Sequence, residues 1–413
     1  MSDNNDNTTH EAPTRRDTIK YGGAVVGGGL LAGCTGDNES DATPTPNGTG
    51  TETSTDTETA SAEDDSYTVT LAPVGDVTVE SPPENAFAVL PWYADMAYAL
   101  GHGDSINSMW FSGGFGEIMN YYLSGLPDES VDWASLEGSY GVTKERLYEL
   151  DSDIHFVDPA WLSTRDGWGR DDVDEVATNI APWFGNQYSN LHLSPPDAWA
   201  DRYEYYTLWE LFEEIAAVYR ERARYEALAE IHATLLAEIK DGLPPKGKRP
   251  TVGYVQIATD LSSLFALRLN APGYYNSHTR PLGAVDAFAD VDISGEFAAV
   301  DFEALLEADP DVLLTLWGMT STVDFGTMKA NLADHDVGRE LSAVQNDRVY
   351  TQGTRFQGPL MNLFQLEMTA KQLYPEQFGE WPGYADGEPY PAFPDDEQLF
   401  DRQRVADIIN GDI

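Results

Sequence analysis

One short helix-turn-strand pattern occurs twice in the chain, and this duplication limits the possible folds more than any other feature. The two segments are VTKERLYELDSDIHFVD, from Val142, and VDFEALLEADPDVLLTL, from Val300. In each segment a capping residue, Thr143 or Asp301, precedes a short helix that ends at an Asp-x-Asp turn, and an apolar run follows. A helix that leads into a buried strand is half of a parallel α/β unit. We therefore expect an α/β fold with two similar lobes, each with a parallel sheet flanked by helices.

Each predicted lobe also opens with a buried apolar run that a turn follows. These runs are Ala86 to Leu90 and Thr251 to Val255. In open parallel sheets, the carboxyl ends of the strands and the loops that leave them form the ligand crevice. The loops after these strands should therefore face a cleft between the lobes.

An amphipathic stretch from Thr207 to Lys240 separates the two lobes and predicts one long spacer helix, which ends before Gly242 and Pro244. Such a helix would be roughly 50 Å long, enough to run along both lobes and keep their relative motion small. The predicted organisation is an export signal (1–34), an acidic tether (35–66), an N-terminal lobe (67–206), the spacer helix (207–241), a C-terminal lobe (249–375) and a C-terminal extension (376–413) that packs on a lobe.

The only cysteine, Cys34, follows a paired arginine (Arg15, Arg16) and an apolar run that is shorter than the about 20 residues needed to cross a bilayer. This layout is typical of an export signal. Leu31-Ala32-Gly33-Cys34 resembles a lipobox, which implies a lipid on Cys34. The segment TRRDTIK resembles a twin-arginine motif, although Thr18 stands where an apolar residue is preferred. We expect an extracytoplasmic protein, lipid-anchored to the outer face of the cytoplasmic membrane, with 35–66 as a flexible tether.

The chain carries 70 acidic and 24 basic residues, a formal charge of -46, although 41% of its residues are hydrophobic. It is therefore globular, and its self-repulsion is tolerable where salt screens charge, which indicates a halophilic source. Nucleic acid and anionic lipid are poor partners for such a chain. With one cysteine, no intramolecular disulfide can form.

Several segments together resemble one protein family: PENAFAVLPWYADMAYALGHGDSI, EGSYGVTKERLYELDSDIHFV, the 207–241 stretch, VDFEALLEADPDVLL and LSAVQNDRVY. They resemble the substrate-binding lipoproteins of ABC importers, in the helical-backbone class for iron-siderophore, haem and cobalamin uptake. The resemblance implies a monomer that captures a ferric siderophore or similar chelate and delivers it to a permease dimer with its ATPase. Haem or cobalamin is the alternative ligand. Glu145 and Glu303 match the family's permease-docking glutamates, and iron would enter only within the chelate, with no other cofactor.

Aromatic and arginine residues recur in the segments expected at strand ends. Aromatic rings stack on planar ligands at low entropic cost, and the planar guanidinium holds anionic oxygens. Ordinary packing is the alternative for any single aromatic residue, and a surface ion pair is the alternative for any single arginine. The candidate ligand-binding residues are Trp92, Tyr93, Trp110, Tyr140, Trp161, Arg165, Tyr275, Arg280, Trp317 and Arg355.

A metal site and an enzymatic site have less support in the sequence. The seven histidines are scattered without an i, i+4 pair, so we predict no bare metal site. No His-Glu-x-x-His helix, Gly-x-Ser-x-Gly elbow or P-loop is present, and we predict no catalytic residue. Metallocluster proteins with a similar lobed architecture need Cys ligands that this chain lacks after Cys34. A secreted cofactor-dependent enzyme remains the alternative of another class, and it would need an acid/base pair in the cleft.

Overall fold

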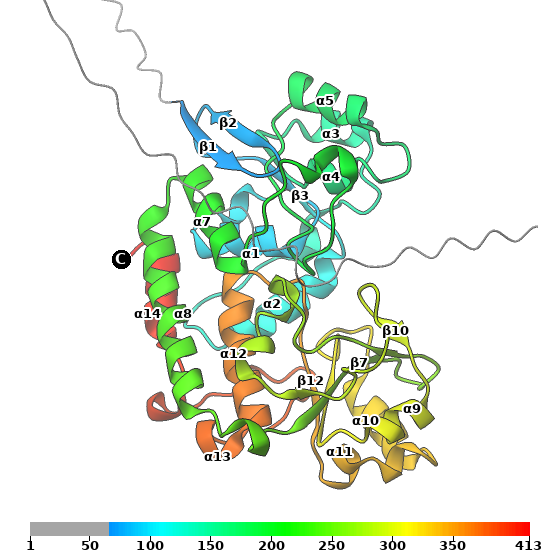
Figure 1. The fold of residues 1–413 in the computed structure, drawn as a ribbon. Coiled ribbons are helices and arrows are strands. Elements are labelled where there is room, and N and C mark those ends of the chain that lie inside the picture. The colour runs from blue at the N-terminus through cyan, green and yellow to red at the C-terminus, as the bar shows by residue number, and fades with distance from the viewer. Residues whose placement is uncertain (1–65) are drawn as a thin grey trace, which may run out of the picture. The chain divides into compact units, whose positions relative to one another are not determined.

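The computed structural model of the protein describes residues 66–413 (Figure 1). The predicted export signal, the predicted lipid site at Cys34 and nearly all of the predicted tether lie outside the described residues. No helix within 66–413 is both long enough and apolar enough to span a bilayer.

The N-terminal lobe contains three small two-stranded sheets. Strands β3 and β6 pair in parallel, with Ala86 opposite Ile154, and β4 pairs with β5 in parallel. Strands β1 and β2 form an antiparallel hairpin. The strands are β1 (Tyr67–Leu71), β2 (Gly75–Val79), β3 (Ala86–Ala88), β4 (Ser108–Met109), β5 (Glu137–Gly138) and β6 (Ile154–Phe156). The helices are α1 (Pro91–Ala99), α2 (Ser112–Leu123), α3 (Lys144–Leu150), α4 (Pro159–Leu162), α5 (Arg170–Asn179) and α6 (Asp197–Ala200).

The C-terminal lobe contains a mixed six-stranded sheet in the order β10-β8-β7-β11-β12, with β9 also pairing with β7. The pairs β7–β11, β11–β12 and β7–β9 are parallel, and β8 is antiparallel to both of its neighbours. The strands are β7 (Thr251–Ile257), β8 (Leu264–Ala266), β9 (Val285–Asp286), β10 (Ala298–Ala299), β11 (Val312–Thr315) and β12 (Val349–Thr351). Helices α9 (Phe302–Ala308), α10 (Phe325–Asp334) and α11 (Ser342–Gln345) belong to this lobe.

The duplicated segments form equivalent elements in the two lobes, which confirms the prediction of a two-lobed α/β fold. The Thr143 side chain accepts a hydrogen bond from Arg146 N at the start of α3, and Asp301 accepts one from Ala304 N at the start of α9. Strands β6 and β11 follow these helices, and β6 pairs in parallel with β3 as β11 does with β7. The Asp-x-Asp turns also correspond, because Asp151 and Asp309 both adopt the left-handed conformation at the helix C-cap.

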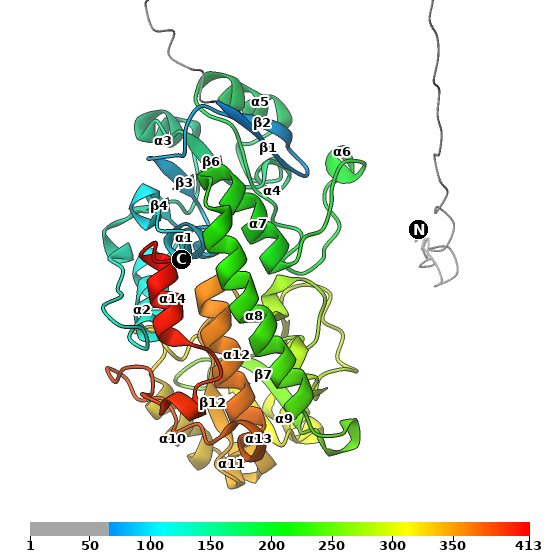
Figure 2. The ribbon, with the colours of Figure 1, turned by 90° about the vertical axis from the view of Figure 1, so that its left-hand side faces the viewer.

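The single spacer helix predicted over 207–241 is wrong. The stretch forms two helices, α7 (Leu208–Tyr219) and α8 (Arg222–Gly242), and the chain turns at Arg220, whose φ is 57°. The helices pack as an antiparallel hairpin, since the Trp209 ring stacks on His232 at 4.1 Å (Figure 2). No Gly or Pro marks this turn, so the apolar periodicity continues across it. Of these two helices only α8 runs between the lobes, and its 21 residues span about 30 Å.

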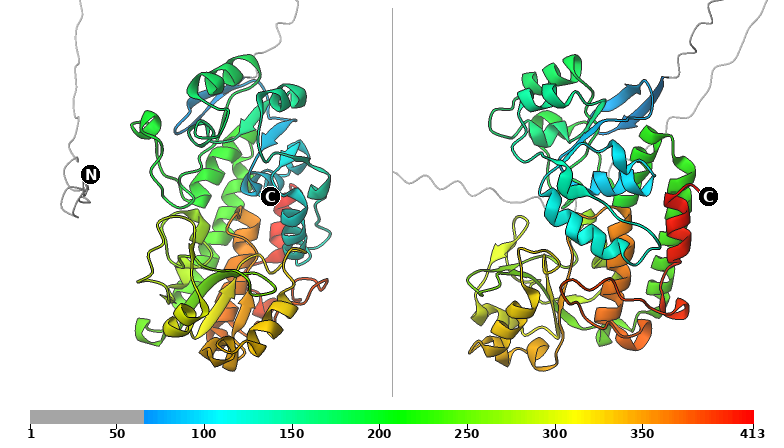
Figure 3. Two further views of the ribbon diagram at one scale, coloured as in Figure 1. Left: turned by 90° about the vertical axis from the view of Figure 1, so that its right-hand side faces the viewer. Right: turned by 180° about the vertical axis from the view of Figure 1, so that it is seen from behind.

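Helix α8 connects the lobes together with two helices from the C-terminal part of the chain. Arg224, near the start of α8, donates to Leu100 O of the N-terminal lobe, and α8 also contacts the 3-10 turn Arg280–Leu282. Helix α12 (Pro359–Leu373) is buried along its whole length. After α13 (Pro375–Phe378), the C-terminal helix α14 (Arg402–Ile409) packs against α8 and α1 (Figure 3).

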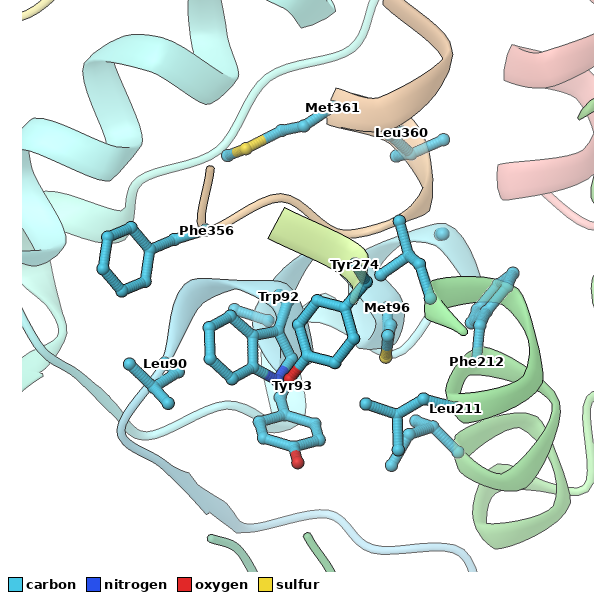
Figure 4. Packing of buried hydrophobic residues seen from close by; sticks show 14 of the residues in the cluster. Leu90, Trp92, Tyr93, Met96, Leu211, Phe212, Tyr274, Phe356, Leu360 and Met361 are labelled. Carbon is cyan, nitrogen blue, oxygen red and sulfur yellow. The ribbon is translucent and has the colours of Figure 1, made fainter. Parts of the chain in front are cut away.

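One hydrophobic core extends across both lobes, and a second core lies within the C-terminal lobe. Where α1, α7 and α12 meet, Trp92 and Tyr93 pack beside Tyr274 of the second lobe (Figure 4). The buried Asp95 carboxylate of α1 accepts hydrogen bonds from Gly358 N, Leu360 N and Met361 N at 3.0–3.1 Å, and thereby caps α12. The lobes are therefore joined by a shared core as well as by the connecting helix.

Candidate functional site

Loops that leave strands of both lobes line a cleft between them. In the N-terminal lobe, Leu90 follows β3, Trp110 follows β4 and Trp161 lies in α4 after β6. In the C-terminal lobe, Trp317 follows β11 and Phe356 follows β12. This placement agrees with the expectation that the carboxyl ends of the parallel strands face the ligand crevice.

The cleft consists of two adjoining cavities, which we call the first and second chambers. The first chamber has a volume of about 470 Å³ and the second about 400 Å³. Both volumes lie in the range usual for small-molecule sites. Trp110, Glu296 and Phe356 line both chambers. The first chamber is also lined by residues that include Tyr140, Trp161, Arg165, Asp166, Trp168, Gln187 and Tyr275, and the second by residues that include Phe111, Gln256, Phe297, Trp317, Thr322 and Arg355.

Phe356 lies at the centre of the aromatic walls of the cleft. Its ring centroid is 5.0 Å from that of Tyr275, 5.6 Å from that of Trp110 and 5.8 Å from that of Trp317. Trp92 stacks on Phe356 from the core side at 6.1 Å with an interplanar angle of 11°. Rings from both lobes thus pack edge and face around one phenylalanine and give the cleft a rigid apolar surface.

Two aromatic residues of the second chamber have unusual backbone conformations. Phe111 has a φ of 51° and Trp317 a φ of 69°, and their rings lie 6.1 Å apart across the lobes. Bulky residues rarely adopt positive φ, and such strained positions concentrate at ligand-contacting sites. This backbone strain supports a ligand-binding role for the second chamber.

The two arginines of the cleft form no ion pair with any carboxylate of residues 66–413. Arg165 is exposed at the rim of the first chamber, where its guanidinium carbon lies 4.2 Å from the centroid of the Trp161 ring. Arg355 is only 2% exposed, lies over the Tyr275 ring at 5.2 Å and donates through Nη1 to Glu296 O at 3.2 Å. Its Nε has no partner within the described structure. Both guanidinium groups therefore keep donors and charge for an anionic ligand.

The buried groups beside Arg355 have shifted pKa values. Burial raises the pKa of Tyr275, and the Glu296 carboxylate raises it further, while Arg355 lowers it. Burial, together with the nearby positive charges of Arg355 and Arg280, lowers the pKa of His278 to about 3. His278 is therefore neutral at pH 7, and its Nδ1 lies 2.6 Å from Gln357 Nε2.

Seven of the ten candidate ligand-binding residues line the chambers: Trp110, Tyr140, Trp161, Arg165, Tyr275, Trp317 and Arg355. The positions of the other three do not support ligand contact. Trp92 and Tyr93 are buried in the core because α1 begins directly after the β3 strand end and turns this face inward. Arg280 donates to Ala271 O at 2.6 Å and Gly273 O at 2.7 Å, and so closes the loop that carries Tyr275.

The cleft-lining residues that the prediction omitted include Phe111, Asp166, Gln187, Glu296 and Phe356. Phe111 and Phe356 directly follow the candidates Trp110 and Arg355 in their loops, so the same strand-end pattern could have identified them. Nothing in the sequence distinguishes Glu296 from the many other acidic residues.

Residues 66–413 contain no group of three or more His, Cys, Asp or Glu side chains that could hold a metal ion. The predicted docking residues Glu145 and Glu303 lie exposed in the first turns of α3 and α9. Their equivalent positions follow from the duplication, and neither forms an ion pair with another residue in the described part of the chain.

Two α/β lobes that enclose an aromatic cleft are typical of extracytoplasmic solute-binding proteins. The profile of the periplasmic binding protein family matches residues 133–355, and the chain belongs to this family. No curated protein sequence matches the chain.

Solved structures with the same fold include three that cover about three quarters of this chain. A periplasmic binding protein from Veillonella parvula is 13% identical, and the match covers 75% of this chain and 97% of that one with a TM-score of 0.52. A petrobactin-binding protein from Bacillus subtilis is 15% identical, with 75% of this chain and 99% of that one covered and a TM-score of 0.52. An iron uptake ABC transporter substrate-binding protein from Streptococcus pneumoniae is 15% identical, with 74% of this chain and 97% of that one covered and a TM-score of 0.52. At these sequence identities the similarity shows that the fold is shared.

Proposed function

We propose that the protein captures a ferric siderophore or a similar anionic iron chelate in the cleft and delivers it to an ABC permease. The observation that carries this proposal is the pair of cleft arginines, Arg165 and Arg355, which have no carboxylate partner among residues 66–413. In a chain with 70 acidic and 24 basic residues, a guanidinium group left without a carboxylate needs a reason. An anionic ligand supplies that reason.

The aromatic lining supports a ligand with planar groups. Trp161, Tyr275 and Phe356 offer ring faces or edges beside the two guanidinium groups. Aryl rings of a chelate would stack on these surfaces, while its anionic oxygens would bind the arginines. The names of similar structures, a petrobactin-binding protein and an iron uptake protein, agree with such a ligand.

Delivery would use the outer surfaces of both lobes. Glu145 and Glu303 occupy equivalent exposed positions on α3 and α9, as docking onto a symmetric permease dimer requires. On this proposal the protein acts as a monomer, a lipid on Cys34 holds it at the membrane after twin-arginine export, and an ATPase drives the permease. Its acidic surface fits a halophilic setting, where salt leaves only close contacts to hold the complex.

A thermal-shift experiment on the full chain in molar KCl tests the proposal. The probes are a ferric tris-catecholate, a ferric trihydroxamate, haem, cobalamin and free divalent metal ions. A bound chelate at 100 times its dissociation constant should add about 2.7 kcal/mol to the free energy of unfolding. A shift with free metal ions and with no chelate would overturn the proposal.

A further inference from the structure

Asp158 is a buried acid that is hydrogen-bonded to the wall of the first chamber but lines neither chamber. It is 1% exposed, lies two residues after the end of β6 and is the N-cap of α4. The residue at the equivalent position of the duplicated segment is Leu316. The fold therefore does not require an acid here, and burial of a carboxylate costs free energy unless it is well hydrogen-bonded.

Four donors from three segments surround the Asp158 carboxylate. Its Oδ1 accepts hydrogen bonds from Ala160 N at 2.7 Å and Trp161 N at 3.4 Å, and thereby caps α4. Its Oδ2 accepts from Gln187 N at 2.7 Å and from Tyr203 Oη at 2.5 Å. Within residues 66–413 it forms no ion pair with a Lys, Arg or His side chain. The carboxylate thus joins α4 to the segment around Gln187.

The capped helix α4 carries one wall of the first chamber. Trp161 lies in α4, and the chain stays hydrogen-bonded after it, because Arg165 N donates to Leu162 O at 2.9 Å and Trp168 N donates to Arg165 O at 3.0 Å. Trp161, Arg165 and Trp168 all line the first chamber. The orientation of α4 therefore decides where the Trp161 ring and the Arg165 guanidinium meet a ligand.

The segment around Gln187 carries a second wall and contacts the other lobe. Gln187 lines the first chamber, and its backbone oxygen accepts a hydrogen bond from Asn190 N at 3.0 Å. The backbone oxygen of Asn190 in turn accepts from Tyr275 N at 2.9 Å, and Tyr275 lines the first chamber from the C-terminal lobe. The hydrogen bond between Asp158 and Gln187 therefore connects the walls that the two lobes contribute.

We propose that Asp158 is a positioning residue of the ligand site, whose ionised carboxylate holds Trp161 and Gln187 in the arrangement that binds the chelate. This inference rests on the proposed function and deepens it, because it assigns part of the affinity to a residue outside the chambers. Walls that are held in place before binding lose less conformational entropy when the ligand arrives.

The hydrogen bonds to Asp158 depend on its charge. Burial raises the pKa of Asp158 to about 6, although the hydrogen bonds from Tyr203 Oη and three backbone N–H groups favour the ionised form. Arg165, which follows α4, keeps its charge at any relevant pH. Burial raises the pKa of each surrounding tyrosine, which therefore stays neutral: Tyr93, Tyr188, Tyr203 and Tyr274. Protonation of Asp158 leaves a weaker acceptor, so the affinity for a chelate should fall as the pH drops below 6.

Fluorescence quenching titrations of the full chain in molar KCl at pH 7.5 test this proposal. The probes are a ferric tris-catecholate and a ferric trihydroxamate. Asp158→Asn should weaken the binding of each probe that the unmodified protein binds by about tenfold. The amide oxygen of the new side chain can still cap α4, but its NH₂ group cannot accept from Gln187 N.

A pH series distinguishes positioning by the charged group from a general effect of the substitution. The dissociation constant of Asp158→Asn divided by that of the unmodified protein should fall from about ten at pH 7.5 to about two at pH 5, because a protonated carboxyl resembles the amide. This ratio, taken at each pH, cancels the titration of the chelate itself.

The matched control is Glu367→Gln. Glu367 is also a buried carboxylate that accepts from a backbone N–H and a tyrosine hydroxyl, Leu399 N at 2.7 Å and Tyr390 Oη at 2.9 Å, but it lies outside both chambers. Glu367→Gln should leave the affinity within twofold, although it also removes a buried charge.

Tyr203→Phe tests the same network without changing the acid. It removes one donor to Oδ2, so the pKa of Asp158 should rise and the affinity should begin to fall at a higher pH than in the unmodified protein. This variant keeps the proposal testable if Asp158→Asn does not fold.

Three outcomes would overturn the positioning role: unchanged affinity in Asp158→Asn, a ratio that is the same at pH 7.5 and pH 5, or an unchanged pH profile in Tyr203→Phe. In each of them the unmodified protein still binds a chelate, so the proposed function stands. Absence of binding to any chelate in the thermal-shift experiment would remove both proposals together.

Discussion

Glu367 of α12 and Arg402 of α14 form a buried ion pair, with Oε1 of Glu367 2.7 Å from Nη2 of Arg402. Their side chains are 0% and 6% exposed. Leu399 N and Tyr390 Oη also donate to the Glu367 carboxylate, at 2.7 and 2.9 Å. The C-terminal extension is thus tied to the central helix by a charge pair whose hydrogen bonds are largely satisfied, and it belongs to the folded core.

Replacing Arg402 by Met should destabilise the protein by about 3 kcal/mol, because it leaves the Glu367 carboxylate buried without its cation. Guanidinium chloride unfolding followed by tryptophan fluorescence measures the effect. Arg404→Met is the matched control, since Arg404 lies on the same helix and its hydrogen bond to Asp412 O is exposed. Similar destabilisation by both substitutions would contradict a special role for the buried pair.

Stability should depend on pH through His155, which is fully buried in β6. Burial lowers the pKa of His155 to about 4, against an unfolded value of about 6.5. The folded state therefore favours the neutral ring. The contribution of the neutral His155 ring to the free energy of unfolding is complete above pH 6.5 and is lost as the pH falls toward 4. The loss between pH 7 and pH 5 is about 2 kcal/mol.

His155→Asn removes this dependence while its side-chain amide can still donate to Ala181 O, the partner 3.1 Å from Nδ1. Denaturation of the variant and of the unmodified protein at both pH values gives the difference directly. The comparison is needed because burial raises the pKa of Asp95 to about 7 and of Asp158 to about 6, which gives pH effects of the opposite sign. If the variant and the unmodified protein differ in free energy of unfolding by the same amount at pH 5 and at pH 7, the pH dependence does not come from His155.

The double substitution Glu145→Gln and Glu303→Gln should reduce chelate uptake by at least tenfold in cells that depend on this protein. Chelate affinity in vitro should stay within twofold, because both residues lie outside the chambers. Glu149→Gln with Glu307→Gln is the matched control, since these are the next acidic pair of the same duplication and also exposed. Equal loss of uptake in control and test variants would argue against specific docking.

Glu296→Gln should tighten binding of an anionic chelate by about fivefold, because it removes a like charge from the boundary of both chambers. The gain should shrink as salt is raised from 0.1 M to molar concentration. Asp292→Asn, an exposed acid that lines neither chamber, should have no effect in the same titrations. Weaker binding in Glu296→Gln would show instead that the carboxylate accepts an essential ligand hydrogen bond.

Sequence reasoning predicted those parts of the fold and the site that short-range patterns specify. The duplicated caps at Thr143 and Asp301, the strands after them and the strand-end loops that carry Trp110 and Arg355 are all encoded within about ten neighbouring residues. The break between α7 and α8 was missed because Arg220 adopts a left-handed conformation that its sequence neighbours do not announce. That turn is favoured by the packing of the two helices against each other and by the Arg220 guanidinium, whose carbon lies 3.9 Å from the centroid of the Tyr67 ring.

The sequence by itself determined two α/β lobes and which loops reach the cleft, because helix caps, apolar periodicity and turns act locally. The tertiary structure decided which of the neighbouring residues face the ligand space. Trp92 is buried and Phe356 lines the cleft because segments more than 250 residues apart in the chain meet there. Such long-range contacts depend on the whole core, and no local pattern records them.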